Sequence, residues 1–421
     1  MNTEEIGARL RAANTAFNAQ YPGESGVRAP VHVVYGGAHL FQSDAVRKLG
    51  ALALKSLDRF APDSATLARV LGLPGGPEMA DAIYSRVVEK LRREPVEDFR
   101  LDFEDGYGNR PDAEEDGHAV SAAAQVAAGF AAGALPPFIG IRIKPFTEEL
   151  RARSFLTLEL FLTALVERTG GRLPPNFVVT YPKAVIAAQV TALADLFDHL
   201  ELALGLPARS LKMELMIETT QSIPILLDLL HAARGRCVAA HFGTYDYTAS
   251  CGITAAYQHM LHPACDFARN AMQVAYAGTG IRLSDGATNV MPVGNDPAAV
   301  HRAWRLHYDH IRHSLECAFY QGWDLHPAQL PTRYAAVYAF FLEGLEAAGE
   351  RLRNFMDKAA QATLAGGVFD DAATGQGLLN YFLRAINCGA ITEAEAEVKS
   401  GLGKDELLSG SFARILDGRR G

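Results

Sequence analysis

Apolar segments of strand length recur along the chain, separated by stretches with helical spacing of apolar residues. Six clear runs and two weaker ones are Val31–Tyr35, Phe99–Phe103, Phe138–Ile143, Phe177–Tyr181, Leu211–Ile217, Cys237–Phe242, Gly280–Ser284 and Phe319–Leu325. Several runs are continuously apolar, which is typical of parallel strands covered on both faces. Helical spacing is clear at Ser154–Glu167, Val185–Leu204 and Ile223–Ala233. The alternation predicts a (β/α)8 TIM barrel, with a doubly wound open sheet as the competing fold.

The two ends of the chain lie outside this alternation. Residues 1–30 are predicted to form an N-terminal helix and a Pro/Gly turn, and residues 31–335 the catalytic barrel. Residues 336–421 are predicted to form a C-terminal helical extension with Gly-rich breaks and no clear strand. Its apolar content is too low for a second core, so we expect it to cap the barrel or to cover a neighbouring subunit. A homo-oligomer is therefore expected.

One long uncharged stretch, Val120–Ile141, has the length of a membrane candidate. It is rich in Ala and Gly and is interrupted by Pro136-Pro137, which favours a helix, a turn and a buried strand. The N-terminus has no apolar core of signal-peptide length. We therefore expect neither a membrane span nor a leader.

Composition and charge narrow the class of protein further. The chain has 421 residues, of which 49% are hydrophobic and 21% charged, and these globular values exclude wholesale disorder. A net charge of −8 without a basic stripe argues against nucleic-acid binding. The five cysteines form no CxxC pair, which indicates a reducing compartment. We expect a cytoplasmic enzyme.

Polar residues follow nearly every predicted strand, at the end where a barrel carries its active site. Glu218 and Asp246 follow adjacent strands and can hold Mg²⁺, or Mn²⁺, through carboxylate oxygens. An α-keto acid would offer two oxygens to such a metal, which would act as a Lewis acid and stabilise an enolate. Arg142 could bind the developing negative oxygen or the carboxylate. This chemistry makes or breaks a carbon–carbon bond beside a carbonyl.

Structural roles compete with each of these assignments. Glu218 and Asp246 could cap helices or brace a loop, and Arg142 could be a structural partner of Glu104 or Asp105. Glu214, four residues before Glu218, is a rival metal ligand on the same side of its strand. Lys183 could be a surface loop lysine or, less in keeping with a metal, a Schiff-base lysine.

The histidines point to no metal site. His301, His307, His310 and His313 share one predicted helix, for which we expect a solvated or interface face, and His326 is expected to anchor a loop. The sequence contains no GxGxxG, GxxxxGK[ST], GxSxG or HExxH motif, so nucleotide-binding and hydrolase classes lack support.

Six segments, in order over about residues 31–330, together resemble one known family. They are Leu101–Gly106 (D-L-E-D in the family), Ile141–Lys144 (V-R-x-N), Tyr181–Lys183 (L-P-K), Leu215–Thr219 (I-E-T), Phe242–Asp246 (F-G-x-x-D) and Gly322–Gln329 (G-x-x-x-I-H-P-x-Q). The family is the citrate lyase β-subunit and malyl-CoA lyase group of HpcH/HpaI aldolases, within the phosphoenolpyruvate/pyruvate barrel superfamily.

The resemblance implies roles for individual residues. Glu218 and Asp246 correspond to the metal ligands and Arg142 to the arginine that binds substrate. Glu104 and Asp105 would position Arg142 or the water molecules bound to the metal. Gly243 and Thr244 of the F-G-x-x-D segment would contact substrate. The implied activity is that of a Mg²⁺-dependent carbon–carbon lyase. Its substrate would be a small keto or hydroxy acid or the corresponding CoA thioester.

The sequence departs from the family at several points. Lys144 replaces the Asn of V-R-x-N, and Ala287 replaces the Pro of a D-G-P segment at Asp285-Gly286. Asp370 or Asp371 in the C-terminal extension could supply an acid to a neighbouring subunit, or could cap a helix. Two other functions stay open: phosphoenolpyruvate-type phosphoryl transfer, and metal-dependent metabolite binding without catalysis.

Overall fold

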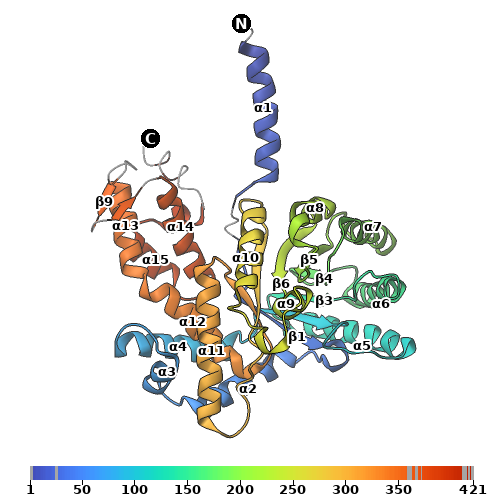
Figure 1. Cartoon of the computed structure of the whole chain (residues 1–421), viewed down its shortest axis with the longest axis horizontal. Coiled ribbons are helices and arrows are strands. Elements are labelled where there is room, and N and C mark those ends of the chain that lie inside the picture. The colour runs from blue at the N-terminus through green and yellow to red at the C-terminus, as the bar shows by residue number, and fades with distance from the viewer. Residues whose placement is uncertain are drawn as a thin grey trace.

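The computed structural model of the chain has eight parallel strands that close into a barrel surrounded by helices (Figure 1). It describes residues 3–23, 27–357, 363–365, 368–370 and 372–409, together with residues 415 and 418. The strands follow chain order, and β8 pairs with β1 through His32 opposite Gly322. The predicted (β/α)8 barrel is confirmed, and the open sheet is excluded. The strands are β1 (His32–Gly37), β2 (Asp98–Asp102), β3 (Phe138–Arg142), β4 (Phe177–Tyr181), β5 (Lys212–Ile217), β6 (Cys237–Phe242), β7 (Arg282–Ala287) and β8 (Gln321–Asp324).

Helix α1 (Thr3–Gln20) precedes the barrel, and three helices connect β1 to β2. The helices from α2 to α12 are α2 (Ala45–Phe60), α3 (Ser64–Leu71), α4 (Pro77–Arg93), α5 (Asp112–Ala131), α6 (Arg151–Thr169), α7 (Ala187–Leu204), α8 (Leu226–Ala232), α9 (Thr244–Ser250), α10 (Pro263–Tyr276), α11 (Pro297–Glu316) and α12 (Leu330–Glu343). Short 3-10 turns lie at Ala38–Leu40, Ile223–Ile225, Ala255–Tyr257 and Pro327–Gln329.

Local sequence explains where several helices begin and end. Pro77 is the first residue of α4, where its missing N–H costs no hydrogen bond. Helices α6 and α7 end at Gly170 and Gly205, both in the left-handed conformation that glycine adopts without strain. The uncharged stretch Val120–Ile141 forms most of α5, a turn and β3, as predicted. No helix within the described ranges is long and apolar enough to cross a bilayer.

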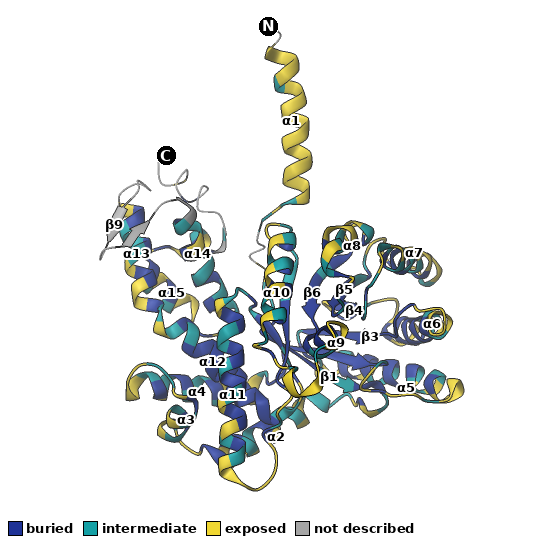
Figure 2. Cartoon of the chain, viewed as in Figure 1, coloured by how far each residue is buried: buried dark blue, intermediate teal, exposed yellow. Residues whose placement is uncertain are grey.

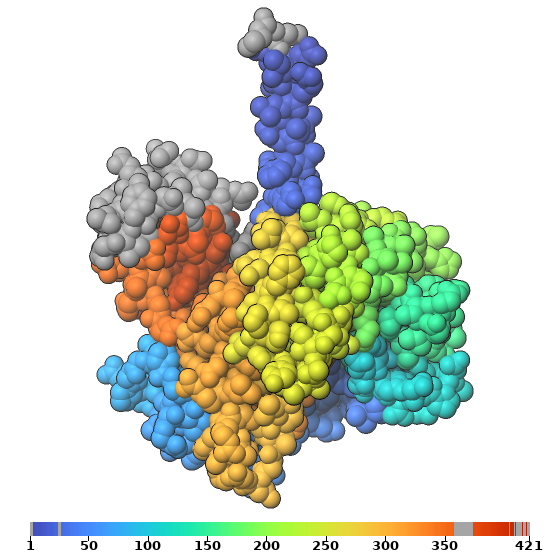
Figure 3. Space-filling model, viewed as in Figure 1, coloured from blue at the N-terminus to red at the C-terminus, as the bar shows by residue number. Residues whose placement is uncertain are grey.

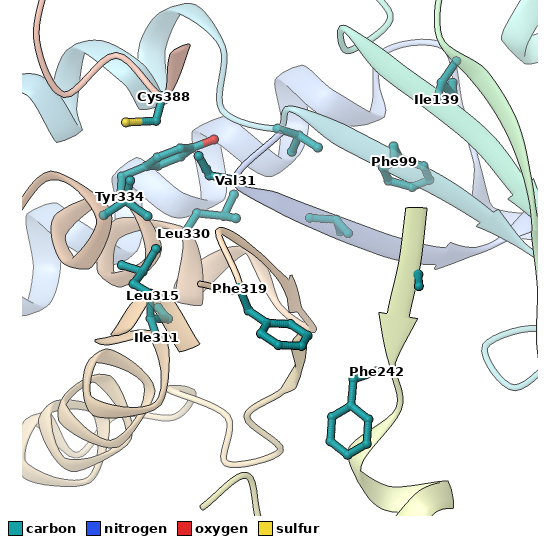
Figure 4. Close-up of a cluster of buried hydrophobic side chains, with 14 of the residues drawn as sticks. Val31, Phe99, Ile139, Phe242, Ile311, Leu315, Phe319, Leu330, Tyr334 and Cys388 are labelled. Atoms are coloured by element: carbon teal, nitrogen blue, oxygen red, sulfur yellow. The ribbon is translucent and has the colours of Figure 1, made fainter. Parts of the chain in front are cut away.

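The main apolar core lies between the barrel and its helices (Figure 2). Strand residues alternate in direction. In β2 Arg100 points into the barrel, where it bonds to Glu214 of β5, and Phe99 points outward against Phe41. Figure 4 shows Phe99 and Ile139 in one cluster with helix residues such as Ile311 and Leu330. Inside the barrel, Arg100 also bonds to Thr180 of β4, so polar and charged side chains meet there.

The C-terminal extension packs onto the barrel through α12 (Figure 1). It contains α13 (Leu345–Asp357), β9 (Thr363–Ala365), β10 (Val368–Asp370), α14 (Ala372–Asn387), α15 (Glu393–Ser400) and α16 (Lys404–Leu408). The prediction of no strand is wrong, because β9 and β10 pair antiparallel; at three residues each, they are too short to give a periodic signal. Helix α12 runs across residue 335, and the division of the chain there stays a prediction.

The expected solvated or interface face for the histidines of α11 is wrong for two of them. His307 and His310 are buried, and both contact the hydroxyl of Thr288 at 2.9 Å. His307 Nε2 also lies 3.0 Å from Asp324 Oδ1. Their polar partners lie outside the helix, at the ends of β7 and β8, so the spacing of residues within the helix gave no sign of them.

The buried His310 makes stability depend on pH. Burial lowers the pKa of its imidazole to about 4, and the nearby His307, His259, Arg269 and His313 act in the same direction. Between about pH 6.5 and 4 the unfolded chain binds this proton and the folded chain does not, so stability falls as the pH falls. Over that window the loss from this group is about 3 kcal/mol.

Urea unfolding of wild type and His310→Gln at pH 7, 5.5 and 4 measures this contribution. The substitution is expected to flatten the decline in unfolding free energy between pH 7 and 4. His199→Gln, at an exposed position of α7, is the matched control and is expected to keep the wild-type slope. Equal slopes for wild type and His310→Gln would contradict the assignment.

Candidate active site

Glu218 and Asp246 lie at the carboxyl ends of neighbouring strands. Glu218 directly follows β5, and Asp246 lies in the first turn of α9, which begins two residues after β6. Between them, Gly243 donates its N–H to Ile217 O at 3.1 Å. A Cβ at Gly243 would come within 2.5 Å of Glu218 Oε2, so only glycine allows the backbone to pass this close to the carboxylate.

Lys183, after β4, lies between carboxylates from three strand ends. Its N–H donates to Glu218 Oε1 at 2.8 Å. Its ammonium forms an ion pair with Glu104 and lies 3.6 Å from Asp105 Oδ1 and 3.9 Å from Asp246 Oδ2. The backbone of Lys183 has φ of +49°, in the left-handed region that residues other than glycine seldom adopt. The structure thus places this lysine at the centre of the predicted site and not in a surface loop.

Arg142, the last residue of β3, is fixed by a carboxylate of β2. Its Nε and Nη2 donate to the two oxygens of Asp102 at 2.7 and 2.5 Å. Its Nη1 lies 3.0 Å from Glu104 Oε2 and 3.6 Å from Asp105 Oδ2. Both acids that sequence paired with Arg142 are therefore in contact with it.

Two aromatic rings hold the guanidinium of Arg142 from other directions. Its Cζ lies 4.9 Å from the ring centre of Tyr35 and 5.5 Å from that of Trp323. The two rings, from β1 and β8, are 4.3 Å apart. A guanidinium bonded at one edge and covered by rings loses little freedom when it binds an anion.

Burial and neighbouring charges set the protonation of the site. Burial raises the pKa of Glu218 to about 7; Lys183 opposes this shift, and Asp246 adds to it. Burial also raises the pKa of Glu104, against the effects of Arg142 and Lys183. Burial would lower the pKa of Lys183, but Glu218 and Glu104 outweigh it, so the pKa is raised and the lysine is a cation.

The other candidates lie further from this centre. Thr244 is buried, and its hydroxyl contacts Met260 Sδ on the β7 side of the barrel mouth. The rival ligand Glu214 lies inside the barrel, where it accepts bonds from Arg100 and Thr180. Lys144 is bonded to Glu115 and to Phe103 O.

The remaining candidates are His326 and the two acids of the C-terminal extension. His326 caps the turn Pro327–Gln329 together with Gln329, which confirms its expected role as a loop anchor. Asp371 and the side chain of Asp370 lie outside the described residues.

Three residues of the site received no individual role from the sequence. Asp102 belongs to the segment Leu101–Gly106, but the sequence did not show that it holds Arg142. Tyr35 and Trp323 lie in predicted strands, but an aromatic residue in a strand is usually core, and nothing marked these two.

The donor set fits a hard divalent cation. Glu218 and Asp246 offer only carboxylate oxygens, the ligands that Mg²⁺ prefers, and Gly243 leaves room beside Glu218. Over the described part of the chain, no group of three or more His, Cys, Asp or Glu side chains is arranged to hold a metal. A cation here would be held by this pair, with the remaining positions left to water or substrate.

A separate cavity of about 270 Å³ lies at the opposite end of the barrel. Its lining includes Arg28, Lys90 and Glu94 together with residues 386–389. Arg28 and Lys90 both pair with Glu94 and with Glu97, so much of the charge is neutralised within the protein. We therefore place no candidate site in this cavity.

Solved structures of two bacterial proteins share the fold. A citrate lyase from Burkholderia xenovorans LB400 aligns with a TM-score of 0.61 and 20% identity, over 89% of this chain and 97% of its own. The protein CitE from Mycobacterium tuberculosis, in complex with magnesium, acetoacetate and coenzyme A, aligns with a TM-score of 0.50 and 15% identity, over 86% of this chain and 99% of its own. At these identities the likeness concerns the fold, and at that level it confirms the expected resemblance.

Sequence comparison gives a different kind of result. Among curated proteins there is no match. The family described as "Domain of unknown function (DUF6986)" matches residues 10–415, which include the whole barrel and most of the C-terminal extension. Because this match covers most of the sequence, the chain belongs to the DUF6986 family.

Proposed function

We propose that this protein is a Mg²⁺-dependent carbon–carbon lyase that acts on a small keto or hydroxy acid or its CoA thioester. The observation that carries the proposal is the carboxylate pair Glu218 and Asp246, set at neighbouring strand ends beside Lys183 and Arg142. The magnesium, acetoacetate and coenzyme A bound by the M. tuberculosis protein of the same fold support this class of substrate.

Glu218 and Asp246 would hold the cation, for which Mn²⁺ is an alternative to Mg²⁺. When bound, it supplies a Lewis acid for a keto oxygen of the substrate. Arg142 orients the carboxylate of the substrate or stabilises negative charge on a reacting oxygen, since Asp102 and the two rings already fix its guanidinium. Glu104 and Asp105 position Arg142 and Lys183 through their ion pairs.

A Mn²⁺ or Mg²⁺ titration, with and without pyruvate or oxaloacetate, tests the proposal. Wild type is expected to bind the cation and to bind it more tightly with the keto acid. Glu218→Gln and Asp246→Asn each remove one anionic ligand, so each is expected to weaken binding by more than about tenfold. Asp228→Asn is the matched control, because it removes an exposed charge from α8, the helix that follows β5. This variant is expected to bind the cation as tightly as wild type does.

Two results would overturn the proposal. In one, wild type binds no divalent cation; in the other, both variants bind it as tightly as wild type. The carboxylates would then be structural. Where binding behaves as expected, a turnover assay with free acids and acyl-CoA thioesters separates a lyase from a metabolite-binding protein without catalysis.

A further inference from the structure

Helix α1 projects from the rest of the molecule (Figures 1 and 3). None of its residues, all of which the structure describes, is buried. Its apolar side chains form one stripe, with Ile6 48%, Leu10 58% and Phe17 60% exposed and Ala13 between them. In proteins most helical stability comes from packing of an apolar face, so this solvent-exposed helix of 18 residues would gain stability by covering a surface with its stripe.

Helix α10 presents a second apolar stripe on its outer face. Its inner face, with Cys265, Ala268 and Met272, is buried against the barrel. On the outer face Phe267 is 64% and Val274 is 82% exposed, and Ala271 lies between them. Phe267 and Val274 are seven residues apart, as are Leu10 and Phe17.

The two helices are joined at their carboxyl ends. Gly23 donates its N–H to Gly278 O at 2.8 Å, and Tyr21 lies against Gly278. Gln20 Nε2 lies 3.2 Å from His231 Nε2 of α8. From this joint α10 runs back along the barrel and α1 extends beyond it (Figure 1).

A second copy related by a two-fold axis that passes beside this joint, perpendicular to both helices, would complete both stripes. The α1 of one copy would run parallel to the α10 of the other, because both helices end at the joint. At equal distances from the joint, Phe17 would meet Val274 and Leu10 would meet Phe267. The symmetry repeats the contact, and the two helix pairs together bury on the order of 1,000 Å², the lower limit for a stable interface.

We propose that two copies of this chain exchange their N-terminal helices, so that α1 of each copy docks on Phe267, Ala271 and Val274 of the other. The proposal does not depend on the chemistry of the barrel. It is an isologous contact, in which each copy contributes both the arm and the surface that receives it.

Cross-linking of the full-length protein tests the pairing. In a background with the exposed Cys251 replaced by serine, the double variant Phe17→Cys/Val274→Cys is expected to form a disulfide-linked dimer under mild oxidation. Neither single variant is expected to do so.

A dimer from Phe17→Cys alone would mean that two α1 helices pair with each other. A link within one chain would mean that α1 folds back on its own α10. No link at all would mean that the stripes do not meet, and each of these three results overturns the proposal.

Sedimentation equilibrium provides an independent measurement. Leu10→Lys/Phe17→Lys is expected to raise the dimer dissociation constant at least about 100-fold, since the dimer loses four buried apolar side chains. Leu202→Lys and Val398→Lys change exposed apolar residues on other helices and are expected to leave it unchanged. A wild-type protein that stays monomeric at micromolar concentration would overturn the proposal.

Discussion

Replacing Arg100 by methionine is expected to lower the free energy of unfolding by about 3–5 kcal/mol. Arg100 lies fully inside the barrel and forms ion pairs with Asp98 and Glu214, the latter at 2.6 Å. Burial acts to raise the pKa of Glu214, but Arg100 and His241 outweigh it and hold that pKa well below its usual range. Without this guanidinium, two carboxylates would remain buried, and the arginine left beside them, Arg282, lies 4.0 Å from Glu214.

Chemical denaturation of wild type and Arg100→Met measures the effect. Arg282→Met is the control, because Arg282 also faces Glu214 but at 4.0 Å and with its side chain 28% exposed; a loss of less than about 1 kcal/mol is expected. Adding Asp98→Asn and Glu214→Gln to Arg100→Met removes the stranded charges and is expected to recover part of the loss. If Arg100→Met unfolds at the same denaturant concentration as wild type, the network contributes no stability.

Replacing Arg142 by lysine is expected to weaken pyruvate binding to the metal-loaded protein by about 10–100-fold. Turnover of any substrate that the protein accepts is expected to fall by about 10²–10³-fold. Lysine keeps the charge, but a single ammonium cannot bond both oxygens of Asp102 and also present a planar donor edge to a carboxylate. Binding of the divalent cation alone is expected to change little, because Glu218 and Asp246 are intact.

Isothermal titration of pyruvate into Mg²⁺-loaded protein measures the difference. Arg236→Lys is the matched control: Arg236 is a buried arginine just before β6, at the other end of the barrel, where it pairs with Glu201. That variant is expected to bind pyruvate as wild type does. Equal affinities of Arg142→Lys and wild type for pyruvate would show that Arg142 has only a structural role, as the ion-pair partner of Asp102 and Glu104.

The strands and the candidate ligands could be predicted because both follow from short-range rules. Continuous apolar runs mark buried parallel strands, and a closed barrel brings the residues after every strand to one end. Glu218, Asp246, Arg142, Glu104 and Asp105 could therefore be placed together from chain position alone. The roles assigned to them stay predictions.

The remaining features depend on contacts between distant parts of the chain. The central position of Lys183 follows from its backbone conformation and from four acids at the ends of three other strands, and none of these is visible in the segment Tyr181–Lys183. The burial of His307 and His310 depends on Thr288 and Asp324 in the same way. Such partners are fixed by tertiary packing, which local periodicity does not record.

Helix α12 is covered from two sides, and this limits how the chain can be shortened (Figure 2). On one side Tyr334 donates to Pro95 O at 3.1 Å, just before β2. On the other, the ring of Phe341 lies 5.4 Å from that of Tyr381 in α14. A chain truncated directly after α12 would expose to solvent the apolar face of this helix that α14 covers in the full-length protein. The shortest chain suited to expression therefore includes the C-terminal extension. The barrel without it is not a useful starting point for engineering.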